Sequence, residues 1–131
     1  MLGGGPIMWT SHKQSTTSLS SCEAELTAIS DATKQALYIK KLLTSLKIPI
    51  TSLLLYSDNS SAITIAGRPL FEFHARLKHY GIKLAHLQEA IASGFLKLEH
   101  RSTTIMPADI LTKSLPPTRF QRLRSLLFVH S

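Results

Sequence analysis

The sequence predicts a single domain of the α/β class. Its 131 residues fit one domain and are enough to bury an apolar core. Two long stretches place apolar residues at helical spacing, and short apolar runs typical of strands lie between and after them. Strands that alternate with helices along the chain are the pattern of an α/β arrangement.

The first half of the chain is expected to hold one strand and one long helix. Residues 7–11 read as a short strand after a glycine-rich turn. Ser20 with Glu23 three residues later forms a capping box, in which each side chain satisfies a free backbone N–H at a helix start. Apolar positions then recur every three or four residues. They predict a helix over residues 21–46, which Pro49 closes.

After Pro49, short strands and helices are expected to alternate. A continuous apolar run is typical of a strand buried on both faces, and proline or glycine marks several of the helix ends. The predicted elements are a buried strand at 53–56, a short helix at 61–66, a long helix through 77–91 that stops at Gly94, a strand at 95–101, a short helix at 108–113 and a final basic amphipathic helix after Pro116 and Pro117.

The charge of the chain favours a polyanionic partner. Fifteen Lys and Arg face eight Asp and Glu, a formal net charge of +7. The excess is concentrated between Arg68 and Arg124, where ten basic residues face four acidic ones. Nucleic acid is the usual partner of such a surface. The alternative is a basic surface that serves solubility alone.

Composition also sets expectations about the compartment. No apolar run approaches the ~20 residues that span a bilayer, and the first residues lack the charged and apolar regions of a signal peptide. A lone Cys22 excludes an internal disulfide and fits a reducing environment. We therefore expect an intracellular protein of the cytoplasm or nucleus, neither secreted nor membrane-bound.

Most of the eight carboxylates have an ordinary structural role. Glu23 completes the capping box, and Asp31 and Glu89 fall on helix surfaces, where a solvated charge is expected. Glu99 alternates away from the leucine face of its strand, and Glu72 lies in an irregular segment. Three candidates for chemistry remain.

The three are Glu25, Asp58 and Asp109, and each has a structural alternative. Glu25 shares a helix stripe with core positions, but an acid near a helix start also favours the helix dipole. Asp58 follows a buried strand at its carboxyl end, where open α/β sheets bind ligands, but it or Ser60 could cap the next helix. Asp109 lies in the first turn of a short helix, as acids often do.

Convergence of the three would make a metal site. Grouped carboxylates repel one another and need a compensating cation. Oxygen-only ligands favour Mg²⁺ or Mn²⁺, and two such ions activate a water and stabilise the leaving oxygen of a phosphodiester. Spacing alone does not show that the three converge. A zinc site from His74, His79, His86 and Cys22 is the alternative, but it lacks the usual ligand spacing.

Four stretches of the chain resemble the ribonuclease H domain of copia-type retrotransposon polyproteins. Residues 9–14 (WTSHKQ) and 19–25 (LSSCEAE) are similar to the stretch that leads into the first helix of the family. Residues 56–62 (YSDNSSA) are similar to the second acidic motif, 74–80 (HARLKHY) to the basic histidine-rich motif and 108–115 (ADILTKSL) to the C-terminal motif. They occur in the family's order and cover nearly the whole chain.

The resemblance implies a ribonuclease H-like fold, a mixed sheet flanked by helices, and an endonuclease that cuts the RNA strand of RNA–DNA hybrids. It makes Glu25, Asp58 and Asp109 catalytic ligands of Mg²⁺ or Mn²⁺. His100, nine residues before Asp109, lies near where related enzymes carry a mobile histidine that assists product release. The alternative for His100 is a strand histidine that faces the core.

The basic group Arg76, Lys78, His79 and Lys83 is expected to hold phosphates of the hybrid, which would make binding depend on salt. Two other functions stay open. One is a non-catalytic basic module that binds RNA–DNA hybrid or duplex without cutting it. The other is a translated remnant without a partner.

The sequence departs from the family in one respect. Members carry a further catalytic Asp on a first strand, whereas no acid precedes Glu23 here. We therefore expect residues 1–131 to be one partial, N-terminally truncated domain, with the missing strands supplied by an upstream polyprotein segment or a partner chain. Unpaired buried backbone groups cost roughly 1–3 kcal/mol each, against a total stability of ~5–15 kcal/mol. The chain alone is expected to fold marginally, to bind metal weakly and to be impaired as an enzyme.

Overall fold

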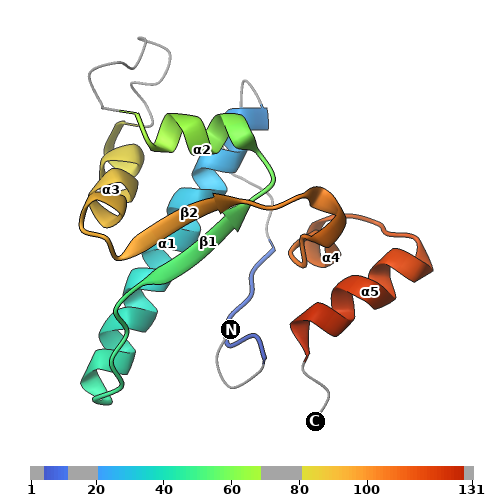
Figure 1. Cartoon of the computed structure of the whole chain (residues 1–131), viewed down its shortest axis with the longest axis horizontal. Coiled ribbons are helices and arrows are strands. Elements are labelled where there is room, and N and C mark those ends of the chain that lie inside the picture. The colour runs from blue at the N-terminus through green and yellow to red at the C-terminus, as the bar shows by residue number, and fades with distance from the viewer. Residues whose placement is uncertain (1–4, 12–20, 69–80, 129–131) are drawn as a thin grey trace. The chain divides into compact units, whose positions relative to one another are not determined.

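The computed structural model describes residues 5–11, 21–68 and 81–128 and confirms a mixed α/β arrangement (Figure 1). The chain divides into two compact units. The central unit is Thr17–His100, and the terminal unit combines Met1–Thr16 with Arg101–Ser131. Among the described helices, none has the length and apolar character of a bilayer span.

The central unit holds a two-stranded parallel sheet among three helices. Leu53 pairs with Leu96 at one end of the sheet and Ser57 with His100 at the other. Parallel strands need a long crossover, and the connection here carries α2 and α3. Figure 1 shows α1 behind the two strands. The elements are α1 (Ser21–Ser45), β1 (Leu53–Ser57), α2 (Ser60–Ala66), α3 (Gly81–Ala92) and β2 (Leu96–His100).

Helix α1 confirms the predicted long helix to within one residue. At its C-terminus the chain turns through Lys47, which has a left-handed backbone with φ of 60°. The Ile48 N–H donates to the Leu43 carbonyl at 2.9 Å, as in a Schellman motif. Pro49 lacks an N–H donor and follows directly, so the helix does not resume.

One apolar cluster holds the central unit together. Ala62 and Ala66 lie one turn apart on α2, and their small side chains let this helix approach its neighbours closely. Burial of each leucine contributes roughly 1.5–3 kcal/mol. The Lys40 ammonium lies 4.1 Å from the centre of the Phe95 ring, an additional contact between α1 and the start of β2. The buried cluster consists of Leu26, Ile29, Ala62, Ala66, Leu84, Leu87, Ala90 and Leu96.

The strand prediction for residues 53–56 was correct in position and wrong about burial. Leu53 and Leu55 pack against the apolar cluster, whereas Leu54 between them is exposed. Successive side chains of a strand point to opposite faces. On the face of β1 away from the core, Leu54 is therefore exposed and Tyr56 is half-buried.

The terminal unit contains short helical elements: η3 (Thr103–Ile105), α4 (Asp109–Thr112) and α5 (Pro117–Leu127). Both α-helices confirm predicted positions. Pro117 occupies the start of α5, where its missing N–H costs no hydrogen bond.

The predicted strand at residues 7–11 is wrong, because the structure shows no strand there. Trp9 is 68% exposed, and Ile7 and Met8 are exposed as well. A strand needs a partner for its backbone N–H and C=O groups, and no sheet partner of this segment lies among the described residues. Instead, the Ser11 hydroxyl donates to the Leu111 carbonyl of α4 at 2.8 Å.

Candidate functional site

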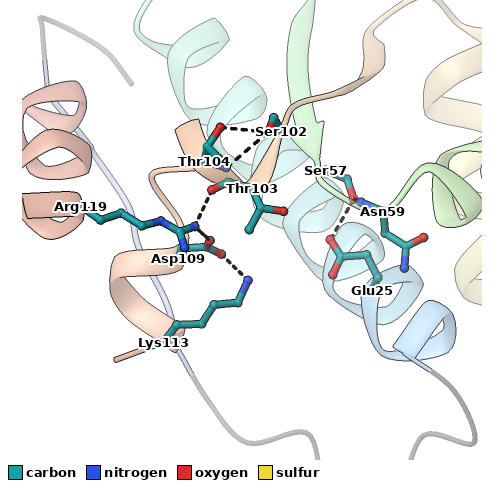
Figure 2. A network of polar contacts seen from close by, with 9 residues as sticks. All are labelled: Glu25, Ser57, Asn59, Ser102, Thr103, Thr104, Asp109, Lys113 and Arg119. Atoms are coloured by element: carbon teal, nitrogen blue, oxygen red, sulfur yellow. Dashed lines mark hydrogen bonds and ion pairs between the residues drawn. The ribbon is translucent and has the colours of Figure 1, made fainter. Parts of the chain in front are cut away.

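A hydrogen bond between α1 and β1 places a carboxylate at the carboxyl end of the sheet. The hydroxyl of Ser57, the last residue of β1, donates to Glu25 Oε1 at 2.9 Å (Figure 2). The same hydroxyl oxygen accepts from the Asn59 N–H at 3.2 Å, so both of its contacts fix its orientation. Ser57 is buried. Glu25 thus lies next to the segment that begins with Asp58, in agreement with its predicted core-side position.

Asp58 does not carry out the structural role that competed with chemistry. Helix α2 is capped by Asn59, whose side-chain oxygen accepts from the Ala62 N–H at 3.0 Å. Neither Asp58 nor Ser60 therefore serves as the cap. Asp58 is half-buried and follows β1 directly, at the strand end where α/β sheets bind ligands.

His100 belongs to the same edge of the sheet. It is paired with Ser57 in the parallel register, so its backbone lies across from the residue that holds Glu25. The predicted alternation along β2 holds for Leu96, which is buried, and Leu98, which packs against the core. The His100 side chain is exposed, so the core-facing alternative is wrong. Its catalytic role stays a prediction.

Asp109 is a buried carboxylate with two cationic partners in the terminal unit. It is the first residue of α4 and only 4% exposed. Lys113 Nζ lies 2.8 Å from Oδ1, and Arg119 Nη2 lies 2.8 Å from Oδ2. The same Arg119 nitrogen donates to the Thr103 carbonyl at 2.6 Å (Figure 2). Asp109 is therefore a buried and doubly paired carboxylate, unlike the solvated acid that is usual in the first turn of a helix.

Sequence reasoning missed Ser57, Lys113 and Arg119. The pairing of Lys113 with Asp109 could have been predicted from spacing, because an acid and a lysine four residues apart on a helix are neighbours. Ser57 directly precedes a candidate ligand, but nothing in the sequence links it to Glu25, 32 residues away. Arg119 had no signal, since its pairing with Asp109 depends on how α5 returns to α4.

The donor atoms at the end of β1 suit a hard cation. Carboxylate and hydroxyl oxygens at the end of β1 are ligands that Mg²⁺ and Mn²⁺ prefer. Glu25 and Asp58 belong to the central unit and Asp109 to the terminal unit. Among the described residues there is no group of three His, Cys, Asp or Glu side chains able to hold a metal. Convergence of the three stays a prediction.

The zinc alternative gains no support. Cys22 packs against the apolar cluster, and burial raises the pKa of its thiol, as do the neighbouring Glu23 and Glu25 charges. A thiol kept protonated is a poor metal ligand. His86 is exposed on α3, and His74 and His79 lie outside the described residues.

Three members of the predicted phosphate-binding group lie outside the described residues: Arg76, Lys78 and His79. Lys83 is half-buried on α3, and its backbone carbonyl accepts from the Ser30 hydroxyl at 3.4 Å. A second basic group follows His100. The basic residues there are Arg101, Lys113, Arg119, Arg122 and Arg124, against Asp109 as the acidic one.

These features define a basic α/β protein with carboxylates at the carboxyl end of a parallel strand. The chain is 33% identical over 128 residues to the retrovirus-related Pol polyprotein from transposon TNT 1-94 of Nicotiana tabacum, covering 98% of this chain and 10% of that polyprotein. It is 37% identical over 129 residues to the corresponding polyprotein from transposon RE1 of Arabidopsis thaliana, covering 98% and 9%. The polyprotein from transposon RE2 of the same plant is 36% identical over 121 residues, covering 92% and 8%.

The homologues of this chain are thus retrovirus-related Pol polyproteins from transposons, and the predicted origin in a retrotransposon polyprotein is confirmed at that level. The chain spans about a tenth of the length of the curated relatives it matches. No family model and no solved structure matches it.

Proposed function

We propose that this chain is a ribonuclease H-type segment of a retrotransposon Pol polyprotein, with a ribonuclease H-like fold, and that its chemistry is hydrolysis of the RNA strand of RNA–DNA hybrids. The observation that carries the proposal is the Ser57–Glu25 hydrogen bond, which holds a carboxylate beside Asp58 at the end of β1. Homology to Pol polyproteins over 92–98% of the chain supports the same origin.

Mg²⁺ or Mn²⁺, when bound, would activate a water and stabilise the leaving oxygen of the phosphodiester. Glu25 and Asp58 would hold it, with Asp109 as the third ligand. Ser57 orients the Glu25 carboxylate by donating to Oε1. Asn59 fixes the backbone directly after Asp58, because its side chain caps α2. Ligands held by such contacts need little rearrangement when a cation arrives.

The partner would be bound through its phosphates. Arg76, Lys78, His79 and Lys83 would contact the hybrid backbone, and counterion release would make binding fall steeply with salt. His100 would assist product release, since its exposed side chain comes from the end of β2 that pairs with Ser57 of β1. The exposed position leaves this side chain free to reorient between steps.

The test combines Mg²⁺ binding with cleavage of a labelled RNA–DNA hybrid. Asp58→Asn and Glu25→Gln should lower both the metal affinity and the rate, the rate by at least about a hundredfold, since even outer partners of metal ligands contribute 10- to 100-fold. Glu89→Gln is the matched control, because Glu89 is an exposed carboxylate on α3. Unchanged metal affinity in folded Asp58→Asn and Glu25→Gln variants would refute the proposal.

A second function is a non-catalytic module that binds hybrid or duplex. The segment after His100 favours it, because five basic residues there face a single acid whose charge is already paired. This function predicts salt-sensitive hybrid binding that is unchanged by Asp58→Asn and is not accompanied by cleavage.

A further inference from the structure

We infer that helix α5 carries a binding surface for single-stranded nucleic acid, formed by Phe120, Arg124 and Phe128. The two rings stack on unpaired bases, and the guanidinium between them contacts phosphate. These three residues are the aromatic stripe of α5. All three belong to the terminal unit, and none is a candidate metal ligand. The inference therefore goes beyond the proposed hydrolysis and does not depend on it.

The three side chains follow one another along a single line of the helix. They are spaced four residues apart, and side chains four apart on a helix are neighbours. The Phe128 N–H donates to the Arg124 carbonyl at 3.3 Å, so Phe128 lies one turn after Arg124 although α5 ends at Leu127. Eight residues separate the two rings by about 12 Å along the axis, so each ring can receive a separate base.

Both rings are open to water. Phe120 is 40% exposed and Phe128 51%, whereas Leu123, on the adjacent face of α5, is completely buried. Leu123 therefore supplies the buried contact of the helix, and the aromatic stripe lies beside it on the surface. Every base has a flat π-face, so exposed aromatic rings can stack on unpaired bases of any sequence.

The charge of α5 suits phosphate. Arg122 and Arg124 are exposed, and no acidic residue follows Asp109 along the chain. The Asp109 carboxylate is already paired with Lys113 and Arg119. The exposed arginines thus give α5 a positive surface, and a guanidinium both pairs with phosphate oxygens and stacks on flat rings.

A single strand fits this surface better than a duplex or a membrane. In a duplex the base faces are stacked on one another and only base edges and phosphates are accessible, which would leave both rings without a partner. A membrane-binding helix needs a broad apolar face. That of α5 is divided, because Leu123 is buried and the exposed Leu126 lies about 120° around the helix from Phe120.

The experiment measures binding of the full chain to fluorescein-labelled oligomers by anisotropy. The probes are an oligothymidylate of ~12 nucleotides, a DNA duplex of the same length, and an abasic oligomer that keeps the phosphates but has no bases. Stacking should make the oligothymidylate bind at least about fivefold more tightly than the abasic oligomer. The duplex should bind more weakly than the oligothymidylate.

Variants of the stripe separate stacking from charge. Phe120→Ala and Phe128→Ala should each lower the oligothymidylate affinity at least about fivefold and leave the abasic affinity unchanged. Arg124→Gln should lower the slope of log K against log salt by about 0.7, the contribution of one single-strand phosphate. Leu126→Ala is the matched control, because it removes an exposed apolar side chain of α5 outside the stripe.

Phe120→Trp covers the case in which Phe120→Ala fails to fold. It keeps an aromatic ring and should therefore keep the oligothymidylate affinity, and a base stacked on the new indole should quench its fluorescence. The wild-type chain, with Trp9 alone, is the control for that signal. Full affinity without quenching would show that no base stacks at this position.

Three further results would overturn the inference. Equal affinity for the oligothymidylate and the abasic oligomer would show that charge alone binds. A preference for the duplex would return the segment to the non-catalytic duplex-binding function. Binding to phosphatidylserine vesicles that depends on Phe120 and Phe128 would assign the stripe to a membrane surface. None of these measurements uses hybrid cleavage or a metal ion, so failure of the proposed hydrolysis is distinguishable from failure of this inference.

Discussion

The two compact units of this chain are stabilised by different forces. The central unit buries a continuous cluster of leucine, isoleucine and alanine side chains from α1, α2, α3 and β2. In the described part of the terminal unit, Met106 and Leu123 are the buried apolar residues, and Asp109 is a buried carboxylate paired with two cations. Apolar burial is largely indifferent to salt, whereas partly exposed ion pairs are screened by it. The terminal unit is therefore expected to lose more stability in high salt than the central unit.

The largest effect is expected in the apolar cluster. Leu87 on α3 is 1% exposed, and Leu87→Ala should lower the free energy of unfolding by ~2–5 kcal/mol through the lost burial and the cavity left behind. Urea denaturation measures the change. Ile82→Ala is the control on the same helix, since Ile82 is 79% exposed and its loss should cost under about 0.5 kcal/mol. Similar losses for the two variants would contradict the packing described here.

The next largest effect should be confined to the terminal unit. Arg119→Leu leaves the Asp109 carboxylate without its Oδ2 partner, a cost of about 1–3 kcal/mol after allowance for the partial exposure of Arg119. Amide hydrogen exchange should accelerate in α4 and α5 and stay unchanged in α1 and α3. Arg122→Leu, an exposed arginine of α5, is the control. Equal acceleration in both units would show that their stabilities are coupled.

A smaller effect is expected at the cap of α2. Asn59→Ala removes the side-chain oxygen that accepts from the Ala62 N–H and should cost about 1 kcal/mol. Ser60→Ala tests the alternative cap and should be nearly neutral. A thermal melt of the two variants gives the comparison, and the reverse order of stability would assign the cap to Ser60.

The smallest effect concerns the reactivity of Cys22. Burial raises the pKa of its thiol, and the Glu23 and Glu25 charges raise it further. Because a higher pKa leaves less thiolate at pH 7, alkylation by iodoacetamide should be slower than for a free cysteine and should rise only at higher pH. Glu25→Gln should speed the reaction slightly. A rate at pH 7 equal to that of an unfolded control peptide would contradict the prediction.

The sequence predicted helices better than strands. Helices α1 and α5 lie where capping and proline signals put them, and Gly94, with φ of 73°, adopts the left-handed conformation expected where a helix stops. The predicted strand at residues 7–11 is not formed, and Leu54 of β1 is exposed although both faces of that strand were expected to be buried. A helix satisfies its backbone within four residues, whereas a strand depends on a partner that local sequence does not specify.

In the candidate site, too, some features followed from the sequence and others were decided only by the tertiary structure. Residue type, spacing and resemblance were enough to select Glu25, Asp58 and Asp109 and to expect a polyanionic partner from the +7 charge. Only the tertiary structure joined Glu25 to Ser57, 32 residues away, and Asp109 to Arg119, ten residues away on the next helix. Only the tertiary structure also chose Asn59 as the cap and left His100 exposed. The physical reason is that the charge and hydrogen-bonding capacity of a side chain are fixed by its residue type, whereas its partner is fixed by the path of the folded chain.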